Sequence, residues 1–178
     1  EPDPVPESVV ATATIGATGD LLMHLPVINS CRESDGTFNF DEIFQYLKDY
    51  SSTVDYAAAN LETTLYGTGK AWSGFPNFNC PDEIVDGLMN AGFDMMLTAN
   101  NHSYDTRTEG MVRTVEVVRE KGLEYLGTRD KEDESFYKVK DINGIKIGMM
   151  AYTHETGDTD EGNKTINKNT VATEDTNL

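Results

Sequence analysis

The sequence predicts an α/β protein, a sandwich whose central strands are mostly parallel. Apolar, β-branched runs alternate along the chain with segments whose apolar residues recur at helical spacing, as in strands joined by helices. An Asn-Gly pair between two later apolar runs predicts a hairpin. The 178 residues suffice for one domain, and a hydrophobic content of 38% is that of a soluble globular protein.

Three helices are expected between the strands. The first covers residues 40–47, where Asn39 and Glu42 resemble a capping box. The second stops at Gly92 and the third at Gly122, since glycine commonly follows the last turn of a helix. Six strands are expected, the last two forming the hairpin, at residues 9–18, 56–59, 94–98, 124–127, 136–142 and 145–152.

Two segments of different composition flank this pattern. Residues 1–8 are rich in proline and charge, which is typical of a linker. Residues 155–178 are rich in Gly, Asp, Asn and Thr and show no periodic apolar face, as in a polar loop or a frayed end. The domain is therefore expected to occupy residues 9–154, and its architecture to be incomplete.

The net charge of the chain limits which classes of binding partner we expect. Fourteen basic residues against 31 acidic ones give a net charge of −17. Such a surface repels nucleic-acid phosphates and anionic lipids, so we expect no nucleic-acid binding. An acidic surface is compatible with the binding of cations, metals and small substrates. It is also what a well-solvated acidic protein has without any such ligand. Cys31 and Cys80 either form a disulfide, as in exported proteins, or remain free thiols.

Polar side chains follow three of the predicted strands where each strand ends. Ligands of an open α/β sheet bind beyond the carboxyl ends of its strands, so these groups are expected to meet at one edge. Carboxylate, amide and imidazole groups are suitable ligands for a divalent cation. The segments are Gly19-Asp20 with His24, Asn60-Leu61-Glu62, and Asn100-Asn101-His102 with Asp105.

Each segment has a simpler interpretation when it is considered alone. A Gly-Asp pair after a strand is usually a turn, and Asn60 is also a suitable helix cap. The adjacent Asn100 and Asn101 are harder to explain by folding, because asparagine is unfavourable in both helices and strands. The coincidence of the three favours a functional site over a set of caps and turns.

The motifs resemble those of a known family. Gly19-Asp20, Asn60-Leu61-Glu62-Thr63 and Ala99-Asn100-Asn101-His102 look like the first three motifs of the CapA family, in the same order and about forty residues apart. The similarity covers most of residues 12–153. Members of this family are associated with making or anchoring poly-γ-glutamate capsule and have a calcineurin-like metallophosphoesterase fold, which the resemblance implies here.

The resemblance also implies metal ligands. Asp20 would bind one metal ion, Asn101 a second, and Glu62 would bridge the two. His24 would either bind a metal ion itself or support the residues that bind it. The ions would be divalent, namely Mn, Zn, Fe or Mg, and this chain would hold them weakly.

The implied catalytic group is His102, as a general acid or an oxyanion donor. Asp105 would orient His102 or cap the next helix. Trp72 and Phe75 lie in a glycine-rich loop and either form an apolar wall over the site or pin that loop to the body. His154 belongs to no motif and is treated as an ordinary loop histidine.

The family pattern is present only in part. The His-Trp-Gly and Gly-His-x-His or Gly-His-x-Pro-His motifs of the family's second half, whose histidines complete its metal site, do not occur in this sequence. The chain therefore resembles the N-terminal half of the fold. We expect little or no catalysis from it alone, and an exposed sheet edge that favours dimerisation.

Two functions follow from the resemblance. The complete protein would be a divalent-metal-dependent hydrolase or transferase acting on a phosphoester or on the γ-glutamyl polymer. Alternatively, it would be a non-catalytic scaffold for capsule assembly, with poly-γ-glutamate or capsule-synthesis membrane components as partners. The family and the linker-like start imply a location on the extracellular face of the membrane or secretion, after removal of an anchor or signal.

Overall fold

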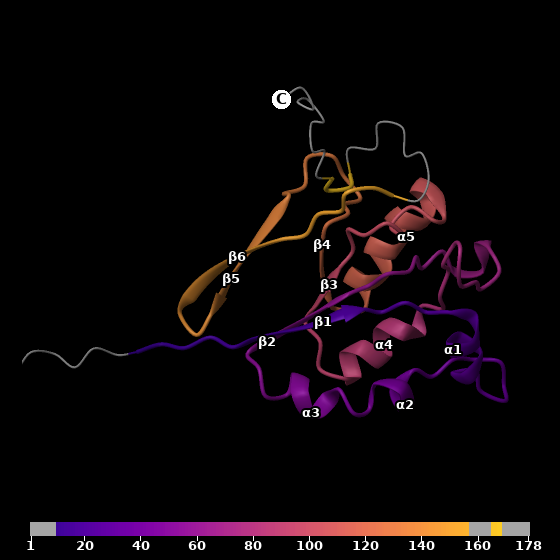
Figure 1. Cartoon of the computed structure of the whole chain (residues 1–178), viewed down its shortest axis with the longest axis horizontal. Helices are drawn as coiled ribbons and strands as arrows, with labels where there is room; N and C mark the ends of the chain where they lie inside the picture. Colours follow the sequence, from indigo (N-terminus) through magenta and orange to yellow (C-terminus); the bar gives the residue numbers. More distant parts are fainter. Residues whose placement is uncertain (1–9, 157–164, 169–178) are drawn as a thin grey trace, which may run out of the picture.

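A computed structural model describes residues 10–156 and 165–168 of the chain. Its central element is a four-stranded sheet in the order β1-β2-β3-β4, and each neighbouring pair is parallel (Figure 1). This confirms the predicted α/β class with mostly parallel central strands. The strands are β1 (Ile15–Asp20), β2 (Tyr56–Asn60), β3 (Met95–Leu97) and β4 (Glu124–Leu126).

Helical segments connect the strands of this sheet. The two longest, α4 and α5, end at the glycines that the sequence indicated, because the amides of Gly92 and Gly122 bond back to Met89 and Arg119. The segments are α1 (Leu25–Ser30), α2 (Asp41–Phe44), α3 (Lys48–Ser51), the 3₁₀ turn η1 (Gly67–Gly69), α4 (Glu83–Asn90) and α5 (Arg107–Glu120).

The helix expected at residues 40–47 is wrong in its extent, because α2 covers only Asp41–Phe44 and the next helix, α3, begins at Lys48. Asn39 Oδ1 accepts the amide of Asp41 at 2.9 Å, but among the described residues no hydrogen bond from the Glu42 side chain completes a capping box. Phe44 is buried, whereas Ile43 is 37% exposed. Phe40 is also buried and Leu47 packs on the core, so the apolar residues still face the core although α2 ends after one turn.

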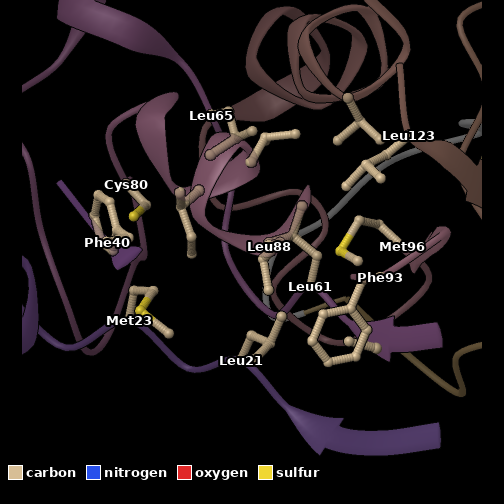
Figure 2. Close-up of a cluster of buried hydrophobic side chains, with 14 of the residues drawn as sticks. Leu21, Met23, Phe40, Leu61, Leu65, Cys80, Leu88, Phe93, Met96 and Leu123 are labelled. Carbon is tan, nitrogen blue, oxygen red and sulfur yellow. The ribbon is translucent and has the colours of Figure 1, made fainter. Parts of the chain in front are cut away.

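The main hydrophobic core lies between the sheet and the helices. Buried side chains from β2, α4 and the segment after β1 meet here, together with the two cysteines, which are free and buried (Figure 2). Burial raises the pKa of both thiols. Leu61, Leu88 and Met96 are among the fully buried members. This core packs the helices against one face of the sheet and so holds the strands in place.

The opposite face of the sheet is covered by the hairpin of β5 (Tyr137–Ile142) and β6 (Ile145–Met150). Asn143 and Gly144 both have positive φ angles, 54° and 82°, so they form the tight turn that the sequence predicted. Lys140 bonds to Glu124 of β4 from the inner face of β5. The hairpin is therefore joined to the sheet by ion pairs as well as by apolar packing.

The first strand begins later than predicted, at Ile15 rather than at residue 9. Residues 10–14 have no regular structure, although Thr14 and Asp55 exchange backbone and side-chain hydrogen bonds. Within the described residues, β1 pairs only with β2 and forms an edge of the sheet. Dimerisation through such an edge stays a prediction.

Part of the C-terminal region packs against the body. Ile166 and Asn167 are buried, and the amide of Asn167 bonds to Gly127 O at 2.8 Å. The Arg129 side chain also bonds to Asn167 and lies over the Phe136 ring at 4.1 Å from its centroid. The predicted linker at residues 1–8, and residues 157–164 and 169–178 of the predicted polar end, lie outside the described residues.

Gly127 ends β4 with a φ of 123°, a conformation that side chains rarely adopt. A Cβ atom at this position would lie 2.5 Å from the backbone nitrogen of Ala99, at the start of the Asn-Asn-His segment. The absence of a side chain here therefore lets the loop after β3 lie against the end of β4.

We expect Gly127→Ala to lower the free energy of unfolding by about 1–3 kcal/mol, the cost of a strained backbone at a non-glycine residue. Gly148→Ala is the matched control, because no atom lies within 4 Å of its added Cβ. The control should stay within about 0.5 kcal/mol of the parent in urea unfolding. Equal stability of the two variants would contradict the close approach.

Candidate functional site

The ends of three parallel strands form the candidate site. In the sheet register, Asp20 of β1 pairs with Asn60 of β2, and Asn60 pairs with Leu97 of β3. Glu62 comes two residues after β2, and His102 lies in the turn that follows β3. The tertiary structure thus brings Asp20, Glu62 and His102 to one edge of the sheet.

Asp20 and Glu62 form a close carboxylate pair. Glu62 is only 9% exposed, whereas Asp20 is exposed. Burial raises the pKa of Glu62, and the charge and hydrogen bonding of Asp20 raise it further, while His102 and the Asn60 amide act in the opposite direction. Two negative groups held together in this way form a site that favours a cation or a shared proton.

Two asparagines link the three strand ends. Asn60 Nδ2 donates to Asp20 Oδ1 at 2.8 Å and to Glu62 Oε2 at 2.9 Å. Asn60 Oδ1 accepts from Asn100 Nδ2 at 3.0 Å, and Asn100 Oδ1 accepts the backbone amide of His102 at 3.1 Å. A chain of amides therefore runs from the carboxylate pair to the histidine.

Sequence analysis did not select Asn60 or Asn100 as site residues. Both belong to the strand-end segments that were expected to form the site, but neither was given a ligand or catalytic role. Their sequence signal was the recurrence of asparagine directly at the ends of two parallel strands, at positions 60 and 100. An amide both donates and accepts hydrogen bonds, so asparagine is suited to hold two carboxylates side by side.

His102 is oriented by Asp105. The Nδ1 atom lies 2.8 Å from Asp105 Oδ2, and the same oxygen accepts the backbone amide of Phe78 at 2.6 Å. Asp105 is buried, and its carboxylate favours a proton on Nδ1, which leaves Nε2 for chemistry. Of the two predicted roles for Asp105, the geometry agrees with orientation of the histidine, since the N-cap residue of α5 is Thr106.

His24 and Asn101 are not joined to the carboxylate pair by hydrogen bonds of the described residues. His24 precedes α1, is exposed, and packs its ring edge-on against Phe78 at 5.1 Å. Phe78 in turn packs against His102 at 4.6 Å. Asn101 is exposed in the turn after β3. Their roles as metal ligands stay predictions.

The carboxylate pair is the part of this edge with groups that could bind a cation, and the predicted metal ions stay a prediction. Asp20 and Glu62 offer carboxylate oxygens, and the amide nitrogen of Asn60, which is a donor and not a metal ligand, is bonded to both. Within the described ranges, no group of three or more His, Cys, Asp or Glu residues is placed so that it could hold a metal ion. No helix of these ranges is long and apolar enough to cross a membrane.

Comparison with known proteins identifies the family. A family model described as bacterial capsule synthesis protein PGA_cap matches residues 14–177. The chain belongs to this family of bacterial capsule synthesis proteins. The match includes all three strand-end motifs.

Individual relatives of this capsule synthesis family are distant. Capsule biosynthesis protein CapA of Bacillus anthracis is 26% identical over 149 residues, which cover 79% of this chain and 34% of that protein. PGA biosynthesis protein CapA of Bacillus subtilis is 26% identical over 143 residues, covering 78% and 37%. An uncharacterized protein, y4sH, of Sinorhizobium fredii is 29% identical over 135 residues, covering 72% and 27%. The chain spans about a third of the length of these relatives.

Glu62→Gln should stabilise the metal-free protein at neutral pH. The raised pKa of Glu62 means that its ionised form is disfavoured in the folded state, so a neutral amide removes repulsion from Asp20. We expect a thermal midpoint a few degrees higher at pH 7–8, and no difference at acidic pH, where Glu62 is protonated. Glu109→Gln on the exposed surface of α5 is the control. An unchanged midpoint at pH 7–8 would argue against repulsion within the pair.

Asp105→Ala should destabilise the protein by about 1–3 kcal/mol, because it leaves the buried amide of Phe78 without its acceptor. Asp105→Asn keeps an oxygen for that amide and should lose less. Urea unfolding of both variants measures the difference. Equal losses would show that the Phe78 hydrogen bond does not depend on the Asp105 oxygen.

Proposed function

We propose that the strand-end site belongs to a divalent-metal-dependent hydrolase or transferase of capsule synthesis, of which this chain provides the N-terminal part. The observation that supports it best is the meeting of the Asp20–Glu62 pair with the oriented His102 at one sheet edge. The B. subtilis relative is named for PGA biosynthesis, which favours the γ-glutamyl polymer or a phosphoester of its assembly as substrate.

In the proposed mechanism each residue has a separate task. Asp20 and Glu62 would hold the cation, which supplies Lewis-acid polarisation of the bond to be broken. Asn60 donates to both carboxylates and holds them side by side. His102 would act in its imidazolium form, donating from Nε2–H to the leaving group or to a developing oxyanion, while its Nδ1–H donates to Asp105 Oδ2.

Family membership is the basis of our proposals for location and partners. We place the protein on the outer face of the cell membrane or in the secreted fraction. Its partners would be poly-γ-glutamate, capsule-synthesis membrane components, or a second copy joined through the edge of β1. These proposals depend on the family and are independent of the catalytic assignment.

A non-catalytic scaffold is the second candidate. It is favoured by the lack of a three-residue metal group within the described part of the chain. In a capsule-producing strain carrying Glu62→Ala and His102→Asn, loss of capsule with normal protein abundance would support the enzyme. Unchanged capsule would support the scaffold.

The cation site is tested directly by titration of the purified chain with Mn²⁺, followed by electron paramagnetic resonance of the free ion. We expect weak binding that Asp20→Ala or Glu62→Ala reduces at least about tenfold, the scale on which loss of metal-site groups acts. Glu109→Ala should leave it unchanged, because this residue lies on the exposed surface of α5. Identical titrations for the parent and Glu62→Ala would reject the assignment.

A further inference from the structure

A surface cleft of about 550 Å³ lies beside the candidate site. One wall is the start of α1, and the other is the segment of residues 70–77. Side chains from both walls line it, including His24, Pro26, Lys70, Trp72, Phe75 and Pro76. The capsule family and the proposed chemistry assign no role to this cleft.

The cleft is connected to the strand-end site through aromatic rings. His24 lines the cleft and packs against Phe78, and Phe78 packs against His102, with centroid separations of 5.1 Å and 4.6 Å. A ligand in the cleft that contacts His24 would therefore be separated from His102, the group that we propose as the acid, by the single buried ring of Phe78. This adjacency is what a substrate subsite requires.

The charge of the cleft is opposite to that of the chain. The protein carries −17, yet the cleft lining includes the basic groups of His24 and Lys70 and no carboxylate. Lys70 is exposed and takes part in no salt bridge among the described residues. A cation that forms no ion pair with the described residues, on a surface that otherwise repels anions, favours an anionic ligand here.

The apolar wall of the cleft is preformed. Trp72 is held against the body, with its ring edge-on to Phe38 at 6.0 Å, so this residue pins the loop. Gly74 lies so close to α1 that a Cβ would be 2.8 Å from the amide nitrogen of Leu25. Phe75, in contrast, is 75% exposed. An exposed ring on an anchored loop offers apolar contact at low cost in conformational entropy.

We propose that this cleft is a substrate subsite that binds an oxyanion carried on a short apolar stem. The oxyanion contacts Lys70 and His24, and the stem packs on Phe75 and Trp72. Either a carboxylate of a γ-linked glutamyl chain or the phosphate of an alkyl ester has this chemistry. The inference rests on the proposed function for its biological meaning, but binding in the cleft needs neither metal nor turnover.

Trp72 is the single tryptophan of the chain, so its fluorescence reports on the cleft. The purified chain is titrated, without added metal, with γ-linked pentaglutamate and separately with hexyl phosphate. We expect saturable change in Trp72 emission with at least one probe, and the probe that binds more tightly identifies the source of the oxyanion. Because no metal or turnover is involved, this result stands apart from the test of the cation site.

Lys70→Gln should weaken binding about tenfold, the loss of one hydrogen bond to a charged group. Phe75→Ala should also weaken it, and both side chains are exposed, so folding is preserved. Lys146→Gln, on the exposed face of β6, is the charge-matched control and should bind as the parent does. No emission change with either probe, or equal weakening by Lys70→Gln and Lys146→Gln, would overturn the proposal.

Discussion

The amide of Asn60 is the interaction on which the candidate site depends. It donates to Asp20 from β1 and to Glu62 after β2, and it accepts from Asn100 after β3. Two carboxylates brought together at a partly buried strand end repel each other, and the two N–H donors of one amide offset part of that repulsion. The parallel register of the sheet makes this possible, because it brings three chain segments to the same edge.

The two faces of the sheet are held by different interactions, and both keep the strand ends in place. The helical side provides a continuous apolar core, which fixes the positions of β2 and β3. The hairpin side adds the ion pairs of Glu124 with lysines of β5. At the site itself, polar hydrogen bonds replace apolar packing. The apolar core and the hairpin contacts therefore stabilise the fold, while the strand ends carry polar groups that folding alone does not require.

Next to the carboxylate pair, His102 and the cleft lined by His24 lie on either side of the Phe78 ring. His102 is held from behind by Asp105, which also accepts the amide of Phe78. Phe78 then separates His102 from His24 and from the cleft beyond it. One buried ring therefore connects the acidic edge, where a cation is favoured, to a basic and aromatic cleft, where an anion is favoured. The substrate that we propose, with a scissile bond and a charged extension, would contact both parts.

The sequence by itself determined the α/β class, the glycine stops of two helices, the Asn143-Gly144 hairpin and the order of the three motifs. These features depend on local periodicity and turn chemistry, which a linear pattern records. Only the tertiary structure decided that α2 and α3 are separate, that Asn60 and Asn100 join the strand ends, and that His24 lines a cleft. The reason is physical: a side chain's partners across a sheet are set by strand register and packing, which neighbouring letters of the sequence do not contain.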